Sequence, residues 1–440
     1  MTFQIIALLV LVAAFVLGTV RPINLGVIAL AATFVIGILA AGLSPDDAVA
    51  GFPVELMLIL VGVTYLFNIG RENGTVAWLI AVAVRAVRGR VALIPWVMFI
   101  VTALLSAIGA VFSPPIVAPM ALAFAAKHRI PQPMMGIMVV HGAAAGSLSP
   151  ISVYGVTVQG VLDQSGLPSN PWGLCLLAFV ASLIPAIGVY LYYGGYRLRG
   201  AGTVAEESGA TSSGSSGSGG NSRTIVGGGN SRTMVDTAVG APPVTFDIVL
   251  TTAAIAALVV GAIFRLDVGL MAMTLAVLLG LHNSEHHDRA LRDVPWTVVL
   301  LVGGTITYVA VLQKIGAIDY LGDLAMAVSA PLVTVLLLGY LAGVVSAFAS
   351  SAGTIAALIP LTVPLLQNST MAVLPVVAVV AIAATIVDVS PFSGNGASVI
   401  ANATPDQRDR VYRVQLIYGG AVVLLAPLLL WLAIVVPTSG

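Results

Sequence analysis

Charge is scarce in this chain. Of its 440 residues only 8% are Asp, Glu, Lys or Arg, whereas soluble domains carry about 25% charged residues. This composition excludes an ordinary soluble domain. Cysteine is also nearly missing, since Cys175 stands alone, which excludes an internal disulfide. The formal net charge is zero and indicates no partner of either charge.

Motifs for energy-driven or metal chemistry are missing as well. The sequence has no Walker A motif, no HExxH and no Cys/His ligand cluster within an apolar run. ATP hydrolysis and zinc catalysis therefore have no support, and we do not expect an enzyme.

Hydrophobic residues make up 59% of the chain, and its mean hydropathy is +1.06. Apolar runs of about 20 residues, the length that crosses a bilayer, recur along most of it. We interpret the chain as an all-α polytopic membrane protein. Its first run, Phe3–Val20, has no basic residues before it and no clear cleavage signature, which favours a retained span over a signal peptide.

A polar Gly/Ser-rich segment, residues 201–246, separates two apolar halves, 1–200 and 247–440. Its composition predicts a flexible linker. The halves resemble each other at a near-constant offset. SPISVYG (Ser149–Gly155) corresponds to SPFSGNG (Ser390–Gly396), and the glycines pair as Gly26 with Gly269 and Gly62 with Gly304. Such an ordered series predicts an internal duplication.

The basic residues predict how the halves are oriented. In the first half we place spans at 3–20, 23–42, 53–70 and 171–194, a hairpin at 91–127 and a long span at 131–163. In the second half we place spans at 247–264, 267–282, 295–312 and 412–436, a hairpin at 330–367 and a long span at 371–403. With Arg85, Arg88 and Arg90 inside, nearly all Lys and Arg fall inside.

Each half then contains five spans and one re-entrant hairpin, which makes the second half an inverted copy of the first. We expect the protein in the cytoplasmic (inner) membrane, with both termini on the outer side and the linker on the cytoplasmic side. Inverted repeats of this kind are typical of secondary transporters.

Four breaks in the helices mark the expected site. The hairpin tips are predicted at Ser113–Pro115 and Ser350–Thr354, and both long spans contain SPxSxxG near their middle. Proline removes a backbone donor and glycine weakens a helix, so the long spans should unwind there. Unwound backbone at membrane depth is tolerated where it lines a cavity or is buried in protein.

The ends of broken helices carry partial charges. N-termini suit an anionic substrate, and the carbonyl-bearing C-terminal ends suit a small cation. Our placement leaves no Lys or Arg in the membrane core, so a bound anion must rely on helix ends, hydroxyls, amides and a co-bound cation. Few ionisable groups fall in that core. They are Asp388 and His141, while Glu55 lies near the outer end of its span and is interpreted as interfacial, and an intramembrane ionisable group is a functional candidate.

This layout resembles the ion transporter superfamily, and within it the divalent anion/sodium symporters and the malonate/dicarboxylate carriers. The resemblance is strongest around VSPFSGNGASVIANA (Val389–Ala403) and LLSAIGAVFSPPIVAPMAL (Leu104–Leu122). Symporters of that family carry Ser-Asn-Thr at each hairpin tip, where this chain has FSPPIV (Phe112–Val117) and ASSAGT (Ala349–Thr354). The resemblance implies an elevator mechanism. Hairpins and broken helices would move against a scaffold that is usually dimeric.

We therefore predict a secondary transporter for a small dicarboxylate, either malonate or a C4 acid. It would be coupled to a cation, with sodium favoured over a proton, and would use no other cofactor. The expected substrate-binding residues are Ser113, Ser152, Ser350, Ser351, Thr354, Ser393 and Asn395. The expected coupling residues are Ser147, Ser149, Asp388, Ser390 and His141, with sodium placed at the Ser149 and Ser390 breaks. The other expected partners are the lipid bilayer and a second copy of the chain, and no nucleic acid.

Two other functions stay open. A cation/proton antiporter of the same superfamily would use Asp388 and His141 as a titrating pair. A channel or membrane-embedded enzyme would belong to another class, but the sequence offers no catalytic constellation for it. The serines and glycines also have a purely structural interpretation, because small residues allow close packing of membrane helices.

Overall fold

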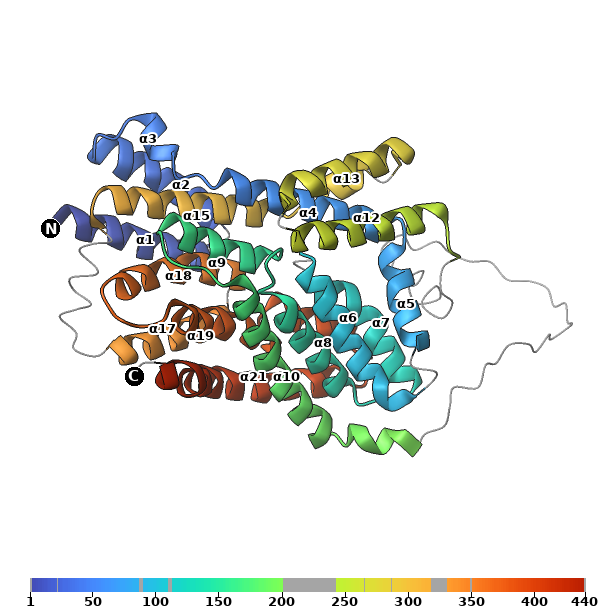
Figure 1. Ribbon diagram of the computed structural model, residues 1–440. Helices are drawn as coiled ribbons and strands as arrows, with labels where there is room; N and C mark the ends of the chain where they lie inside the picture. The colour runs from blue at the N-terminus through green and yellow to red at the C-terminus, as the bar shows by residue number, and fades with distance from the viewer. Residues whose placement is uncertain are drawn as a thin grey trace, which may run out of the picture.

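The computed structural model describes residues 2–21, 23–86, 90–109, 113–200, 243–264, 266–285, 287–317, 331–348 and 350–438. All statements about the structure below concern these residues. Within them every regular element is a helix (Figure 1). The predicted linker, 201–246, falls largely outside the described residues, which resume at residue 243 before the helix that begins at Phe246.

The first half contains ten α-helices in the described residues. They are α1 Thr2–Val20, α2 Leu25–Ala32, α3 Pro45–Val49, α4 Val54–Glu72, α5 Thr75–Ala86, α6 Ile94–Ala107, α7 Ser113–Lys127, α8 Gln132–Gly146, α9 Val153–Gln164 and α10 Pro171–Tyr192. A π-helical segment, Thr33–Ala40, continues α2 to the length of the predicted span.

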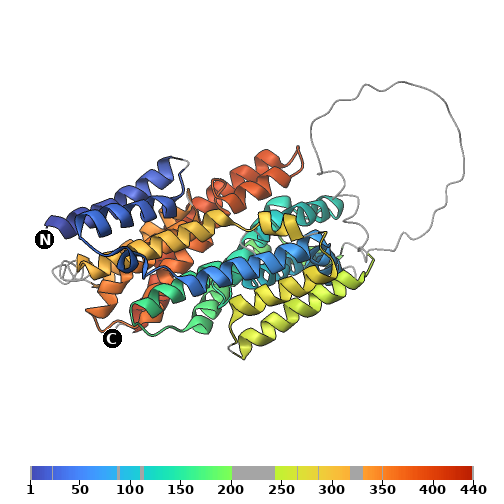
Figure 2. The same cartoon turned by 90° about the horizontal axis from the view of Figure 1, so that it is seen from above.

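The described part of the second half contains nine α-helices. They are α12 Phe246–Ile263, α13 Val268–His282, α14 His287–Arg292, α15 Trp296–Lys314, α17 Pro331–Ser346, α18 Ser351–Gln367, α19 Val373–Ile386, α20 Gly394–Asn402 and α21 Arg408–Leu430. The start of α1 and the end of α21 lie at one end of the molecule, and α12 begins at the other (Figures 1 and 2).

The surface of the helices fits a lipid environment. Within the described residues five helical stretches are long and apolar enough to cross a membrane, namely 54–72, 171–192, 287–314, 373–402 and 408–438. In α10 only 28% of the apolar window is buried, and side chains such as Leu176 and Ile184 are 63% and 64% exposed. Such apolar exposure along whole helices supports a multi-pass membrane protein.

Both predicted hairpins are present as pairs of packed helices. In the first, a 3₁₀ turn at Val91–Leu93 leads into α6, and α7 packs back against α6. In the second, α18 packs back against α17. The first predicted tip begins α7 at Ser113, and the second begins α18 at Ser351, with Ser350 as its N-cap.

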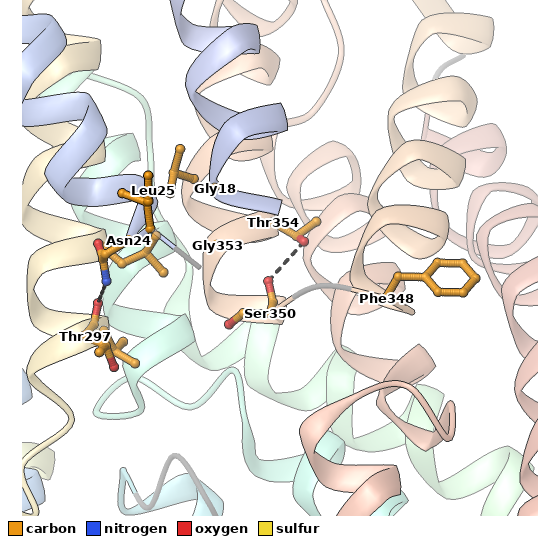
Figure 3. A pocket seen from close by; sticks show the side chains of 11 residues that line it. Gly18, Asn24, Leu25, Thr297, Phe348, Ser350, Gly353 and Thr354 are labelled. Atoms are coloured by element: carbon orange, nitrogen blue, oxygen red, sulfur yellow. Dashed lines mark hydrogen bonds between the residues drawn. The ribbon is translucent and has the colours of Figure 1, made fainter. Parts of the chain in front are cut away.

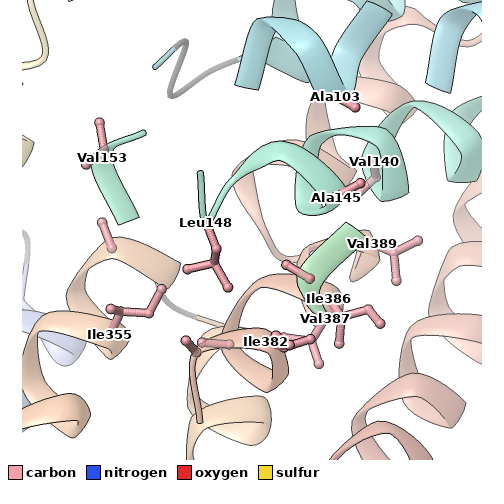
Figure 4. Packing of buried hydrophobic residues seen from close by; sticks show 14 of the residues in the cluster. Ala103, Val140, Ala145, Leu148, Val153, Ile355, Ile382, Ile386, Val387 and Val389 are labelled. Atoms are coloured by element: carbon pink, nitrogen blue, oxygen red, sulfur yellow. The ribbon is translucent and has the colours of Figure 1, made fainter. Parts of the chain in front are cut away.

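Both long spans are broken where the SPxSxxG motifs predicted. The helix α8 ends at Gly146 and α9 begins at Val153. In the second half a 3₁₀ turn at Val387–Val389 follows α19, and α20 begins at Gly394. The two breaks share one hydrophobic core, in which Leu148 of the first break and Val387 and Val389 of the second lie in the same cluster (Figure 4). The breaks are therefore buried in protein.

The sequence-based boundaries missed parts of the fold. The helix α5 was not predicted because its 12 residues are too few to cross a bilayer. The short helices α3 and α14 were missed because they lie in polar connections. The last helix, α21, was predicted to begin at residue 412 but begins at Arg408, because its first turn is charged and hydropathy alone does not mark it.

Outside the hairpins, helices from the two halves cross at glycines. The α2 residue Gly26 meets Gly304 of α15 so closely that a Cβ on Gly304 would lie 2.0 Å from the Gly26 carbonyl oxygen. The α4 residue Gly62 meets Gly269 of α13, where a Cβ on Gly62 would lie 2.7 Å from the Gly269 carbonyl oxygen. In the sequence comparison Gly26 corresponds to Gly269 and Gly62 to Gly304. In the structure each glycine packs instead against the counterpart of the other, so that Gly26 contacts Gly304 and Gly62 contacts Gly269.

Candidate functional site

The second serine of each SPxSxxG motif holds its break in shape. The Ser152 hydroxyl accepts a hydrogen bond from the Gly155 amide at 3.2 Å and donates to the Ser147 carbonyl at 2.5 Å. The Ser393 hydroxyl accepts from the Gly396 amide at 3.0 Å and donates to the Asp388 carbonyl. Each serine caps the helix that follows. Both are buried, and a role in binding substrate stays a prediction for them.

The glycine that closes each motif is required by a close backbone approach. A Cβ on Gly155 would lie 1.9 Å from the Ser149 carbonyl oxygen, and one on Gly396 would lie 2.0 Å from the Ser390 carbonyl oxygen. No side chain fits at these distances. The motif therefore ends one helix and begins the next within a few residues inside the protein.

Asp388 lies at the centre of a buried polar group that joins the second break to the second hairpin. Its Oδ1 is 2.5 Å from the Ser351 hydroxyl, and its Oδ2 accepts from the Asn395 amide at 3.0 Å. The Ser351 hydroxyl is 2.9 Å from that of Ser346, which lies 2.6 Å from the Ala384 carbonyl oxygen. We call Asp388, Ser351, Ser346 and Asn395 the acid cluster.

The first half also contributes to this region. Tyr154, in the first break motif, lies within interaction distance of Ser351 and Asp388. The helix that carries it, α9, packs against α18, and in the reciprocal arrangement α7 packs against α20. Each broken helix thus contacts the hairpin of the other half. Sequence reasoning missed Tyr154 and Ser346. The correspondence of Tyr154 with Asn395 in the two motifs was the available signal for Tyr154.

A cavity of about 270 Å³ opens at the start of α18 (Figure 3). We call it the tip pocket. On one side it is lined by Ser350, Gly353 and Thr354 of the second hairpin, and on the other by residues of α1, α2 and α15. Its size is close to the lower end of small-molecule sites, which span about 300–1,000 Å³. A small organic molecule fits such a space.

The polar groups of the tip pocket are uncharged. Ser350 is the N-cap of α18, yet its side chain makes no capping hydrogen bond, so the first amides of that helix lack this partner. Asn24, which caps α2, and Thr297 lie across the pocket and are joined by a 2.6 Å bond from the Asn24 amide to the Thr297 carbonyl. No Lys or Arg is among the described residues that line it.

His141 lies apart from these groups. It is fully buried in α8, and its Nε2 is 2.6 Å from the Tyr418 hydroxyl of α21. Its Nδ1 has no hydrogen-bond partner, and neither has either side-chain polar atom of the fully buried Gln415 on α21. Within the described chain His141 forms no ion pair with Asp388. Gln415 and Tyr418 could not be singled out from the sequence, because the hydropathy of residues 412–436 predicts only an uninterrupted span.

Replacing Tyr418 with phenylalanine should destabilise the fold by about 1 kcal/mol, because a fully buried histidine nitrogen loses its partner. The free energy of unfolding, measured by denaturant titration of the purified protein, tests this. Tyr412→Phe on the same helix is the control, since Tyr412 is 39% exposed. Equal free energies of unfolding for the two variants would show that the hydrogen bond between His141 of α8 and Tyr418 of α21 does not stabilise the fold.

The remaining predicted residues lie at the first hairpin and the first break. Ser113 is fully buried at the start of α7, and its hydroxyl has no hydrogen-bond partner among the described residues, which leave out 110–112. The Ser149 hydroxyl donates to the Ala107 carbonyl at the end of α6. Ser147 bonds its own helix at the Ala144 carbonyl. The structure therefore divides the predicted site into the tip pocket, the acid cluster and the first break.

Comparisons with known proteins agree with a carrier. The family described as "Dicarboxylate carrier protein MatC N-terminus" matches residues 1–147, which end at the first break. This confirms the resemblance to dicarboxylate carriers over that segment. A search of curated proteins gave no match.

Among solved structures 21 chains match. One is the YdaH transporter of Alcanivorax borkumensis, with a TM-score of 0.56 and 16% identity, over 88% of this chain and 86% of that one. Identity at this level shows a shared fold. Both matches are described as carriers or transporters, in agreement with the expectation of a transporter and not an enzyme.

Proposed function

We propose that the protein is a secondary transporter that moves a small dicarboxylate, malonate or a C4 acid, across the cytoplasmic membrane, with its substrate in the tip pocket. The observation that carries this proposal is the pocket itself. It offers hydroxyls, an amide and the N-terminus of a 17-residue helix, and no basic side chain among its described lining. Helix N-termini favour anions, so a carboxylate has a partner there without a paired cation from the protein.

The packing supports an elevator built from inverted repeats. Glycines that correspond in the two halves exchange partners, as expected of two copies related by a two-fold axis. The hairpins and broken helices contact one another across the halves. The tip pocket lies between the second hairpin and the helices α1, α2 and α15, where a moving domain would meet a scaffold. Both termini outside, the linker inside and a homodimer belong to the same proposal.

Uptake by the purified protein in liposomes tests this function. We expect accumulation of labelled malonate or succinate that follows an imposed cation gradient, and weaker or no accumulation of monocarboxylates. Separate sodium and proton gradients identify the coupling ion. The absence of gradient-driven uptake for every mono- and dicarboxylate in the panel would refute the proposal. Cation exchange with no organic anion present would instead favour the antiporter.

A further inference from the structure

We propose, resting on the transport function above, that the coupling ion is a proton and that Asp388 carries it. The protonated acid heads a hydrogen-bonded chain, which we call the relay, through the Ser351 and Ser346 hydroxyls to the Ala384 carbonyl, the final acceptor. The relay is part of the acid cluster, in which hairpin and broken helix meet. Its three oxygen–oxygen contacts measure 2.5, 2.9 and 2.6 Å in that order.

Counting hydrogens shows why a proton belongs there. Each serine hydroxyl has one hydrogen to donate, and a carbonyl has none. Two hydroxyl hydrogens cannot fill three contacts, so an ionised Asp388 leaves one pair of oxygens facing each other without a hydrogen. A protonated Asp388 supplies the third. It donates to Ser351, Ser351 donates to Ser346, and Ser346 donates to Ala384. Every contact is then a hydrogen bond, and the Asn395 amide still donates to the second carboxyl oxygen.

The surroundings offer no charge that would hold Asp388 ionised. Its side chain is buried, and within the described residues it forms no ion pair. The elements around it carry these titratable groups besides the α21 arginines: Tyr154 and Asp163 on α9, His141 on α8, Tyr340 on α17, and Asp409, Tyr412 and Tyr418 on α21. The arginines of α21, Arg408, Arg410 and Arg413, lie in its exposed first turns. A buried carboxylate without a positive partner is costly, and a proton removes that cost.

Sodium has less to bind at the breaks. The Ser149 carbonyl oxygen accepts a hydrogen bond from the Ser152 amide at 3.1 Å and lies 2.9 Å from the Ser152 hydroxyl. The Ser390 carbonyl oxygen accepts from the Ser393 amide and lies near the Ser393 hydroxyl, at the same distances. Each hydroxyl has a single hydrogen, which it also directs at the Ser147 or Asp388 carbonyl, so the Ser149 and Ser390 carbonyls each keep an amide donor and share the hydroxyl. At the breaks where sodium was expected, these carbonyl oxygens are thus already hydrogen-bonded by the capping serines.

The relay gives the proton a mechanical consequence. Ser351 begins α18, and its neighbour Ser350 faces the tip pocket. Loss of the proton reduces the contacts Asp388–Ser351, Ser351–Ser346 and Ser346–Ala384 from three hydrogen bonds to two, so it changes the bonding where the broken helix meets the hairpin tip. The proton thereby acts on the start of α18 through Ser351, and the substrate acts on the same helix start through the tip pocket at Ser350.

Infrared spectroscopy tests the proton without any substrate. Spectra of the full-length protein in lipid, near neutral pH and free of sodium, report the carbonyl stretch of a protonated carboxylic acid. We expect this band in the wild type, its loss in Asp388→Asn and a shifted frequency in Ser351→Ala, which removes the hydrogen-bond acceptor of the acid. Asp406→Asn is the control, because that exposed carboxylate is already ionised at this pH.

A wild-type spectrum without the band would overturn the proposal. So would an unshifted band in Ser351→Ala, which decides the question if Asp388→Asn does not fold.

Transport separates this inference from the proposed function. In sodium-free liposomes a proton gradient should drive malonate accumulation by the wild type. Asp388→Asn should lose accumulation but keep exchange of external labelled for internal unlabelled malonate, because exchange moves no net proton. Accumulation driven by sodium alone, or retained in Asp388→Asn, would overturn the proton inference while transport stands. If the infrared band is present but no dicarboxylate is accumulated or exchanged, the proposed substrate is wrong and the proton site stands.

Discussion

Gly396→Ala should lower dicarboxylate uptake by at least about tenfold, because overpacking a rigid site costs about 1–3 kcal/mol or more. The added Cβ would lie 2.0 Å from the Ser390 carbonyl oxygen. The neighbouring atoms are backbone and cannot rotate away. To relieve the overlap, the first turn of α20 must move away from the break, and the Ser393 cap and the Asn395 contact to Asp388 move with it.

Gly394→Ala is the matched control two residues earlier in the same helix. A Cβ at Gly394 meets no heavy atom within 4 Å. Alanine favours a helix more than glycine, so this variant should transport as well as the wild type and be equally or more stable. Uptake rates, normalised to folded protein in the liposomes, compare the two. Equal uptake by both variants would contradict the tight geometry of the break.

Gly353→Leu should weaken dicarboxylate binding by at least about tenfold, or about 1.4 kcal/mol, while the fold persists. A Cβ at Gly353 meets only the methyl groups of Leu301, at 3.7 and 3.8 Å, which is ordinary contact. The larger leucine side chain must extend into the tip pocket, where it occupies the space proposed for substrate. Leucine also suits a helix interior better than glycine, so the first turn of α18 is not disturbed.

Gly353→Ala provides the graded comparison, because it adds only the Cβ that fits. Calorimetric titration of malonate into the purified variants measures the affinity, and thermal unfolding monitors the fold. We expect near wild-type affinity for alanine and loss of binding for leucine, with similar unfolding temperatures. Unchanged malonate affinity in Gly353→Leu would contradict substrate binding in the tip pocket and would favour a substrate site at the acid cluster.

Much of the fold follows from local sequence signals. The SPxSxxG motifs predict the two breaks, and their serines and glycines lie where that prediction needs them. Hydropathy predicts the long helices within a few residues. The signal fails where a helix is too short to span, as in α5, or where charge precedes an apolar run, as in α21.

The division of the site could not be predicted, because it depends on side-chain direction and on contacts between distant segments. Ser350 and Ser351 are adjacent, yet the first lines the tip pocket and the second reaches Asp388. The far wall of the pocket comes from Asn24 and Thr297, which the sequence marks only as a helix start and a span. Gln415 is conspicuous only because its polar atoms are buried without partners.

The exchange of glycine partners bears on how the chain is made. Gly26 in α2 reaches its contact only when α15 exists, and Gly62 in α4 only when α13 exists. A newly synthesised first half would therefore sit in the bilayer with both contact faces open until the second half is inserted. The segment between the halves, residues 201–246, must be synthesised during that wait. The two halves, produced as separate polypeptides, should each be short-lived alone and should protect one another from proteolysis when made together.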